Sequence, residues 1–166
     1  MALLNRTAAK MSGAALLGGA MLATPLAASA ASHKQSITHT TQGWTLTLKL
    51  LPAETFAHKT NASTHGEMYK LGGQEPVEKS KANHHLVVFL KHDGKPVEHA
   101  TVQMRYQQVK PRHTSWKQVP VVRMDIIGSG KKTTHFGNNV LLKPGNYRVD
   151  VTVNHKIKSD FMLDVN

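Results

Sequence analysis

The sequence predicts an all-β protein: a single immunoglobulin-like antiparallel β-sandwich of about seven strands that follows a cleaved signal peptide. Three observations predict this class. Short apolar or alternating segments recur after residue 43, turn-forming Gly, Pro, Asn and Asp separate most of them, and no segment after residue 30 has a clear helical apolar period. The 136 residues that follow Ala30 in the 166-residue chain fit one domain with one core.

The first 30 residues have the three parts of a secretory signal peptide. Arg6 and Lys10 precede an uncharged run, MSGAALLGGAMLATPLA, and the small-residue tripeptide ASA follows at 28–30. The apolar part is interrupted by Gly, Ser, Thr and Pro and is shorter than the roughly 20 residues that span a bilayer. We therefore expect residues 1–30 to be removed and the mature protein to be periplasmic.

The mature chain begins with a polar segment, 31–42, which we expect to be flexible. Alternating apolar residues then predict a strand that begins at Trp44 and ends at Pro52. Residues 53–81 show little pattern and read as a long loop within the sandwich domain 43–166. A loop of that length in a compact domain is expected to be functional or to contain short elements of its own.

The remaining strands follow at short intervals. We expect them at 84–91, 100–107, 116–127, 133–142, 147–153 and 158–165. Tyr147 follows the turn Lys143-Pro144-Gly145-Asn146 and is a candidate for the tyrosine that closes a corner of such sandwiches through its hydroxyl.

Composition restricts the partners. Without Arg6 and Lys10, 19 of the 21 Lys and Arg residues remain against 10 Asp and Glu, so the mature protein is basic. Its aromatic residues are not interleaved with basic ones, which argues against nucleic acid. The chain has no cysteine, so a bound metal must be held by His, Met or carboxylate groups. All eleven histidines lie after residue 30.

The segment MDIIGSGKKTTHFGNN, 124–139, reads as a hairpin. If Ser129 and Gly130 form a two-residue turn, Met124 pairs with His135 across the two strands, where Cβ atoms lie about 4.5–5.5 Å apart. A thioether and an imidazole suit copper, especially Cu(I), better than hard cations. The ordinary alternatives are a core methionine and a strand histidine bonded to the backbone.

Other histidines are candidate ligands. His84 and His85 open a strand and must point to opposite faces, so only one of them can join a given cluster. His155 lies in the turn between the last two strands. His58, His65, Glu67 and Met68 in the long loop are either a second metal-collecting patch or ordinary solvated residues.

Four segments together resemble a known family. They are GWTLTLKLLPAE (43–54), NHHLVVFL (83–90), Met124 with THFGNN (134–139), and PGNYRVDVTV (144–153). This arrangement resembles the periplasmic immunoglobulin-like proteins that assist bacterial high-affinity iron uptake and bind copper. DGKPVEHA (93–100) shows a looser similarity to small exported copper-handling domains.

The resemblance implies a metal site. The family builds it from a His-x-Glu on an early strand, a Met and a His on either side of a hairpin, and a late His. These positions fall on His85, Met124, His135 and His155, while the Glu position falls on Val87. The candidates for a replacement carboxylate are Glu54 and Glu67.

The sequence therefore predicts a periplasmic accessory or carrier protein that binds copper, with iron as the second candidate metal. An inner-membrane metal permease and a second copy of the chain are its candidate partners. Metal binding should weaken as pH falls through the ordinary histidine pKa near 6.5. We expect no catalysis, because the sequence lacks a nucleophile motif, a phosphate loop and HExxH.

Two alternatives remain for the function. The first is an interaction module without metal, in which a basic sandwich docks on an anionic partner. The second is a sandwich that offers a strand edge to a client chain.

Overall fold

The computed structural model describes residues 35–57, 68–126 and 133–166. The expected signal peptide and three members of the loop cluster, His58, His65 and Glu67, lie outside these residues. No helix of the described part is long and apolar enough to cross a membrane.

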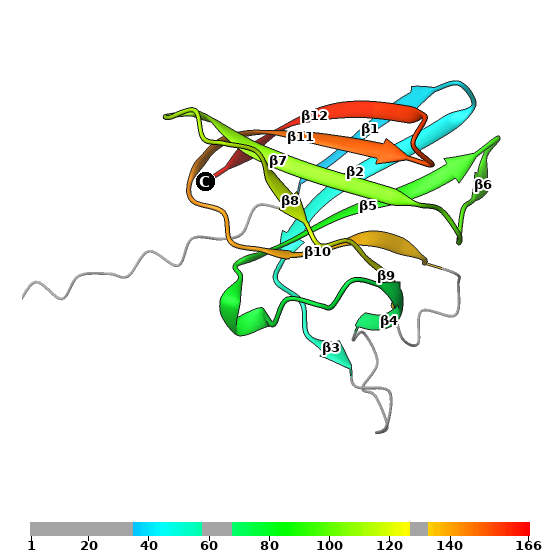
Figure 1. Ribbon diagram of the computed structural model, residues 1–166, viewed down its shortest axis with the longest axis horizontal. Coiled ribbons are helices and arrows are strands. Elements are labelled where there is room, and N and C mark those ends of the chain that lie inside the picture. The colour runs from blue at the N-terminus through cyan, green and yellow to red at the C-terminus, as the bar shows by residue number, and fades with distance from the viewer. Residues whose placement is uncertain (1–34, 58–67, 127–132) are drawn as a thin grey trace, which may run out of the picture.

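The described residues form twelve strands in two sheets, so the all-β sandwich is confirmed although the expected number of strands, about seven, was too low (Figure 1). The elements are β1 (Gln35–Thr41), β2 (Trp44–Pro52), β3 (Phe56–Ala57), β4 (Met68–Gly73), the short 3-10 helix η1 (Lys79–Lys81), β5 (His84–His92), β6 (Lys95–Pro96), β7 (Val102–Lys110), β8 (Lys117–Val119), β9 (Val122–Ile126), β10 (His135–Val140), β11 (Gly145–Val153) and β12 (Ile157–Val165).

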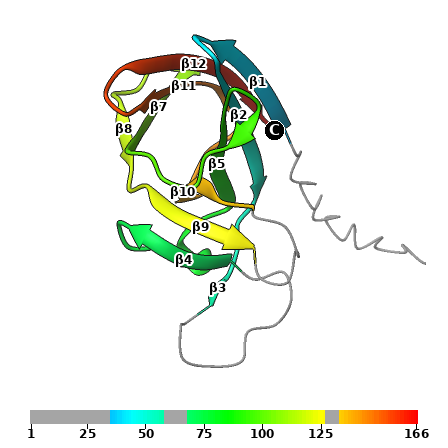
Figure 2. The same cartoon turned by 90° about the vertical axis from the view of Figure 1, so that its right-hand side faces the viewer.

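The two sheets differ in size. The larger has the order β1-β2-β5-β10-β9-β4-β3, with β6 paired to β5, and the smaller has the order β12-β11-β7-β8. The smaller sheet faces β1, β2, β5 and β10, whereas β9, β4 and β3 continue the larger sheet beyond it (Figure 2). One part of the larger sheet therefore has no second sheet packed against it.

The core lies between the sheets and follows the period-two pattern of the strands. Leu46, Leu48 and Leu50 of β2 have almost no exposed surface, and neither have Val149 and Val151 of β11. Alternate side chains of a strand point to opposite faces, so this pattern fixes which face of each strand is internal.

The first strand lies within the segment 31–42 that was expected to be flexible, of which residues 31–34 are outside the described part. Gln35–Thr41 forms β1, an edge strand paired along its full length with β2. Gln42 and Gly43, at φ 50° and 75°, make a turn of the kind that joins adjacent strands. Ile37 is the one apolar residue of β1, so the sequence lacks the alternating apolar pattern that predicts a strand. The strand is held by backbone pairing, by a 2.9 Å bond between the Thr38 and Thr47 hydroxyls, and by the stacking of His39 on Phe161 of β12.

The expected strand 116–127 is two strands in different sheets. β8 pairs with β7 in the smaller sheet, whereas β9 pairs with β10 and β4 in the larger one. Pro120 lies at the crossing, where a residue without an N–H group cannot continue the ladder.

The expected long loop 53–81 contains short elements. β3 and β4 extend the larger sheet, and η1 follows before β5. β4 pairs with β9, so this excursion adds strands beside the hairpin that carries Met124 and His135. The ordered structure of β4 therefore depends on its pairing with β9.

The corner predicted at Tyr147 is present. Its hydroxyl donates to the Lys143 carbonyl (2.9 Å) and accepts from the Lys143 N–H (3.0 Å). The side chain is buried, so replacement with Phe leaves both backbone groups without this partner.

We expect Tyr147→Phe to lower the free energy of unfolding by about 1–3 kcal/mol. Urea unfolding of the mature protein measures this. Tyr106→Phe, at the neighbouring partly buried ring 6.1 Å away, is the matched control. Equal losses for the two variants would contradict a special role for the corner.

Candidate metal centre

Strand pairing places three of the four predicted ligands on one face of the larger sheet. His85 and His135 are next to the core residues Leu86 and Phe136, and Met124 is the cross-strand partner of His135. They therefore point away from the core, to the outer face.

The cross-strand pair predicted from the hairpin is confirmed. Met124 of β9 lies opposite His135 of β10, and both side chains are almost fully buried, at 0% and 1% exposure. The turn of this hairpin, at 127–132, lies outside the described residues. The register nevertheless agrees with a count outward from Ser129 and Gly130.

His85 of β5 and His135 of β10 approach one another over the middle of the face. The pair Val87–Gly137 lies between them in the register, and the two ring centroids are 5.9 Å apart at an interplanar angle of 87°. Gly137 allows the close approach of β10 to β5, because a Cβ there would lie 2.0 Å from the Leu86 carbonyl oxygen. No side chain at 137 separates the rings.

Both imidazoles are held in one tautomer. His85 Nδ1 lies 2.9 Å from Asn139 Oδ1, and His135 Nδ1 lies 2.7 Å from the Thr133 carbonyl oxygen. Both partners are acceptors, so each Nδ1 carries the proton and each neutral ring has its lone pair on Nε2. The two Nε2 atoms are buried and have no hydrogen-bond partner in the described structure.

This arrangement fits a metal. A histidine ligand usually donates its other ring N–H to a carbonyl or carboxylate group, which fixes the ring and leaves the remaining nitrogen for the ion. An unpaired buried nitrogen is otherwise unfavourable. Two such atoms on neighbouring, edge-on rings, with the buried Met124 thioether opposite His135, constitute a partial set of neutral donors.

Burial also keeps these donors free of protons. Burial, and secondly the nearby His135, lower the pKa of the His85 imidazole to about 4, although the hydrogen bond to Asn139 acts to raise it. Burial is likewise the main cause that lowers the pKa of His135. The expected loss of binding near pH 6.5 is therefore moved to more acidic conditions.

Apolar rings line the pair. Phe89 stacks on His135 with centroids 5.0 Å apart, and Phe56 of β3 meets His85 edge-on at 5.9 Å. Val87, Val122 and Met124 form a second small apolar cluster here, separate from the main core. The donors thus lie in a low-dielectric environment, which explains the lowered pKa values.

Asn139 also belongs to the site, although the sequence did not indicate it as a ligand. Its Oδ1 also accepts from the Glu54 N–H (3.1 Å), and its Nδ2 donates to the carbonyls of Glu54 (2.9 Å) and Val77 (2.8 Å). One buried amide therefore fixes a ring and joins both ends of the excursion to β10. Asn138 accepts from Val77 N–H and donates to the Glu75 and Pro120 carbonyls.

The remaining candidates are placed elsewhere. His155 lies in the exposed β11–β12 turn of the smaller sheet, beside a hollow on that sheet's outer side, and does not join His85 and His135. His84 pairs with Val140 and bonds Asn83 through Nδ1, so the two adjacent histidines point to opposite faces as predicted. Met68 is buried in β4.

The missing carboxylate is not replaced in the described part of the chain. No group of three or more His, Cys, Asp and Glu side chains that could hold a metal occurs there, and Met is not counted in such a group. Glu54 is fixed through its backbone, and Glu67 lies outside the described residues.

Comparison with known proteins supports the fold. No family model and no curated protein matches the sequence. A copper-bound variant of FetP from a uropathogenic Escherichia coli strain has a TM-score of 0.56 at 12% identity, covering 81% of this chain and 97% of that one. The copper-reconstituted P19 protein of Campylobacter jejuni also has a TM-score of 0.56, at 11% identity, covering 80% and 95%.

A second FetP structure, of the protein as isolated, has a TM-score of 0.52 at 13% identity and covers 81% and 97% of the two chains. At these identities the likeness establishes a shared fold. The resemblance suggested by the sequence motifs is thus confirmed at the level of the fold.

The lowered pKa values predict an acid-sensitive metal-free protein. An unfolded His85 takes up a proton below about pH 6.5, whereas the folded imidazole does so only near pH 4. The unfolded state therefore binds more protons in this window, and the free energy of unfolding falls as pH decreases through it.

We expect His85 alone to account for a loss of about 3 kcal/mol between pH 7 and pH 4. Urea unfolding across this range measures it, and His85→Leu should flatten the dependence. His155→Leu, at an exposed turn, should leave it unchanged. The same slope in all three proteins would contradict the buried neutral state of His85.

Proposed function

We propose that this protein is an exported carrier that binds one copper ion, as Cu(I), through Nε2 of His85, Nε2 of His135 and the thioether of Met124. The observation that carries the proposal is the pair of buried, unpartnered Nε2 atoms on rings whose Nδ1 protons are already bonded. The copper-bound neighbours of the same fold add support.

The donor set favours copper over iron. Two neutral imidazoles and a thioether are soft or intermediate donors, whereas Fe(III) and the harder divalent ions prefer oxygen. The site is buried and has no anionic ligand, so an ion with one positive charge is less unfavourable there than an ion with two or three. Cu(I) meets both conditions.

The proposed role is delivery. The expected signal peptide places the mature protein in the periplasm, where it would pass copper to an inner-membrane permease or assist iron uptake, as in the family it resembles. A second copy of the chain remains a candidate partner. A binding role agrees with a site made of metal donors and apolar rings.

Copper titration tests the site. The mature protein should bind about one equivalent of Cu(I) in anaerobic competition with a chromophoric chelator. Met124→Leu and His135→Ala should weaken binding, His135→Ala by roughly 100-fold or more, since even the loss of a residue that orients a ligand costs 10–100-fold.

His155→Ala is the matched control, because this histidine lies on the smaller sheet away from the pair. It should titrate like the parent. If Met124→Leu and His135→Ala also titrate like the parent, the hairpin is not the site. Absence of tight binding, with partner binding that falls steeply with salt, would instead support the charge-docking alternative.

Asn139→Ala tests the orientation of His85. Loss of the Oδ1 acceptor frees Nδ1, so we expect Cu(I) affinity to fall about 10–100-fold. Asn138→Ala removes the adjacent amide, which has no bond to His85, and serves as the control. Thermal unfolding of both variants separates lost affinity from lost structure. Equal affinities in the two would contradict the assignment.

A further inference from the structure

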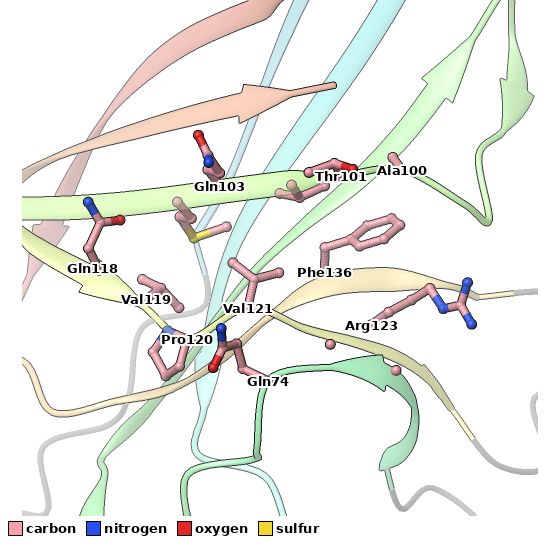
Figure 3. Close-up of a pocket in the computed structure, with 14 residues that line it drawn as sticks. Gln74, Ala100, Thr101, Gln103, Gln118, Val119, Pro120, Val121, Arg123 and Phe136 are labelled. Atoms are coloured by element: carbon pink, nitrogen blue, oxygen red, sulfur yellow. The ribbon is translucent and has the colours of Figure 1, made fainter. Parts of the chain in front are cut away.

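A cleft opens on the other face of β9. Its volume is about 900 Å³, and it lies between β7 and β8 of the smaller sheet and β9 with the end of β4 in the larger one (Figure 3). This is the region where the larger sheet continues beyond the smaller sheet. It is separate from the metal centre, which lies on the outer face.

One wall of the cleft is an unpaired edge of β7. β8 pairs with Met104, Arg105 and Tyr106, and in the described part of the chain no strand continues beside 101–103. The chain instead crosses to the larger sheet at Pro120. A position for a short strand is left beside β7.

Backbone groups on that edge point into the cleft. The Thr101 N–H and carbonyl both bond Asn154, in the turn on the opposite side of β7. Backbone groups of successive strand residues point to alternate sides. The N–H and carbonyl of Val102 therefore face the cleft, in line with those of Met104, which pairs with β8.

The floor is apolar. Met104 and Phe136 are almost fully buried, and Val119 and Val121 lie beside them along the cleft (Figure 3). Apolar side chains that alternate along an extended peptide could pack on such a floor.

A cation marks one end. Arg123 donates from Nη1 to His99 Nδ1 and from Nη2 to the Leu71 carbonyl, while its Nε is buried without a partner in the described structure. The ion pairs of the described Glu75, Glu78 and Asp150 are made with Lys70, Lys81, Arg105 and Arg148. A guanidinium has five N–H donors. Two of them are bonded and the Nε–H is buried, which leaves one N–H on Nη1 and one on Nη2 for a carboxylate.

We propose that this cleft binds an extended peptide segment that carries a carboxylate side chain: the segment pairs with the Val102 edge of β7, as a strand added where β8 ends, and its carboxylate bonds Arg123. The proposal does not rest on copper binding. The partner is a protein with an exposed, acidic, extended segment.

The test uses the ¹⁵N-labelled mature protein and two peptides, acetyl-Val-Glu-Val-Glu-Val-amide and the same peptide with Gln in place of Glu. With the Glu peptide, amide signals of Val102, Gln103 and Arg123 should shift and saturate. The Gln peptide should bind about tenfold or more weakly, the loss expected for one hydrogen bond to a charged group.

Variants assign the contacts. Arg123→Gln should weaken the Glu peptide about tenfold and leave the Gln peptide unchanged. Val102→Pro removes an N–H that the chain's own sheets do not use, and it should weaken both peptides. Arg148→Gln, on the exposed face of β11, is the matched charge control and should change neither. Thermal unfolding verifies that each variant is folded.

Three results would overturn the proposal. The first is absence of saturable shifts at the cleft. The second is an equal effect of Arg123→Gln and Arg148→Gln, which would indicate general charge attraction. The third is equal binding of N-acetylglutamate amide alone, which would indicate a site for small carboxylates without strand pairing. None of these results changes the outcome expected for copper titration, so the peptide proposal and the copper proposal can each be wrong without the other.

Discussion

The bond from His85 Nδ1 to Asn139 Oδ1 is the interaction on which the outer face of the larger sheet depends. This bond fixes the tautomer of His85. The other bonds of the Asn139 amide attach the chain at Glu54 and Val77 to β10. A buried amide is stable only when most of its groups are bonded, so ring, strand and excursion hold one another in place. The same bond leaves Nε2 of His85 without a proton.

In the proposed metal centre, the burial of the two imidazoles has opposite effects on folding and on metal binding. Burial lowers the pKa values of the two imidazoles, which destabilises the metal-free fold in acid. It also leaves two nitrogen atoms unpaired, which is unfavourable in itself. The same features make the nitrogens available to an ion at neutral pH. Because a ligand that binds only the folded state stabilises it, an ion would repay the local cost. Functional sites commonly break local rules in this way.

Local rules predicted much of this arrangement. The count outward from Ser129 and Gly130 gave the Met124–His135 pair, since cross-strand register follows from the turn. Strand alternation separated His84 from His85, and the turn before Tyr147 indicated the corner. Each depends on residues close in sequence or on one strand, where period and turn chemistry decide the outcome.

What the sequence could not supply is the meeting of distant segments. His85 and His135 come together because β10 pairs with β5. The residues of these two strands do not by themselves indicate that they pair or in which register. His155 was an equally suitable ligand by residue type, but it lies in the other sheet. Asn138 and Asn139 appeared in the sequence only as part of the THFGNN motif, with no role of their own. Yet two asparagines inside a strand are unusual, because Asn is depleted in strands. That conflict was the available signal for their role. Their amides, rather than any strand propensity, attach the excursion to β10.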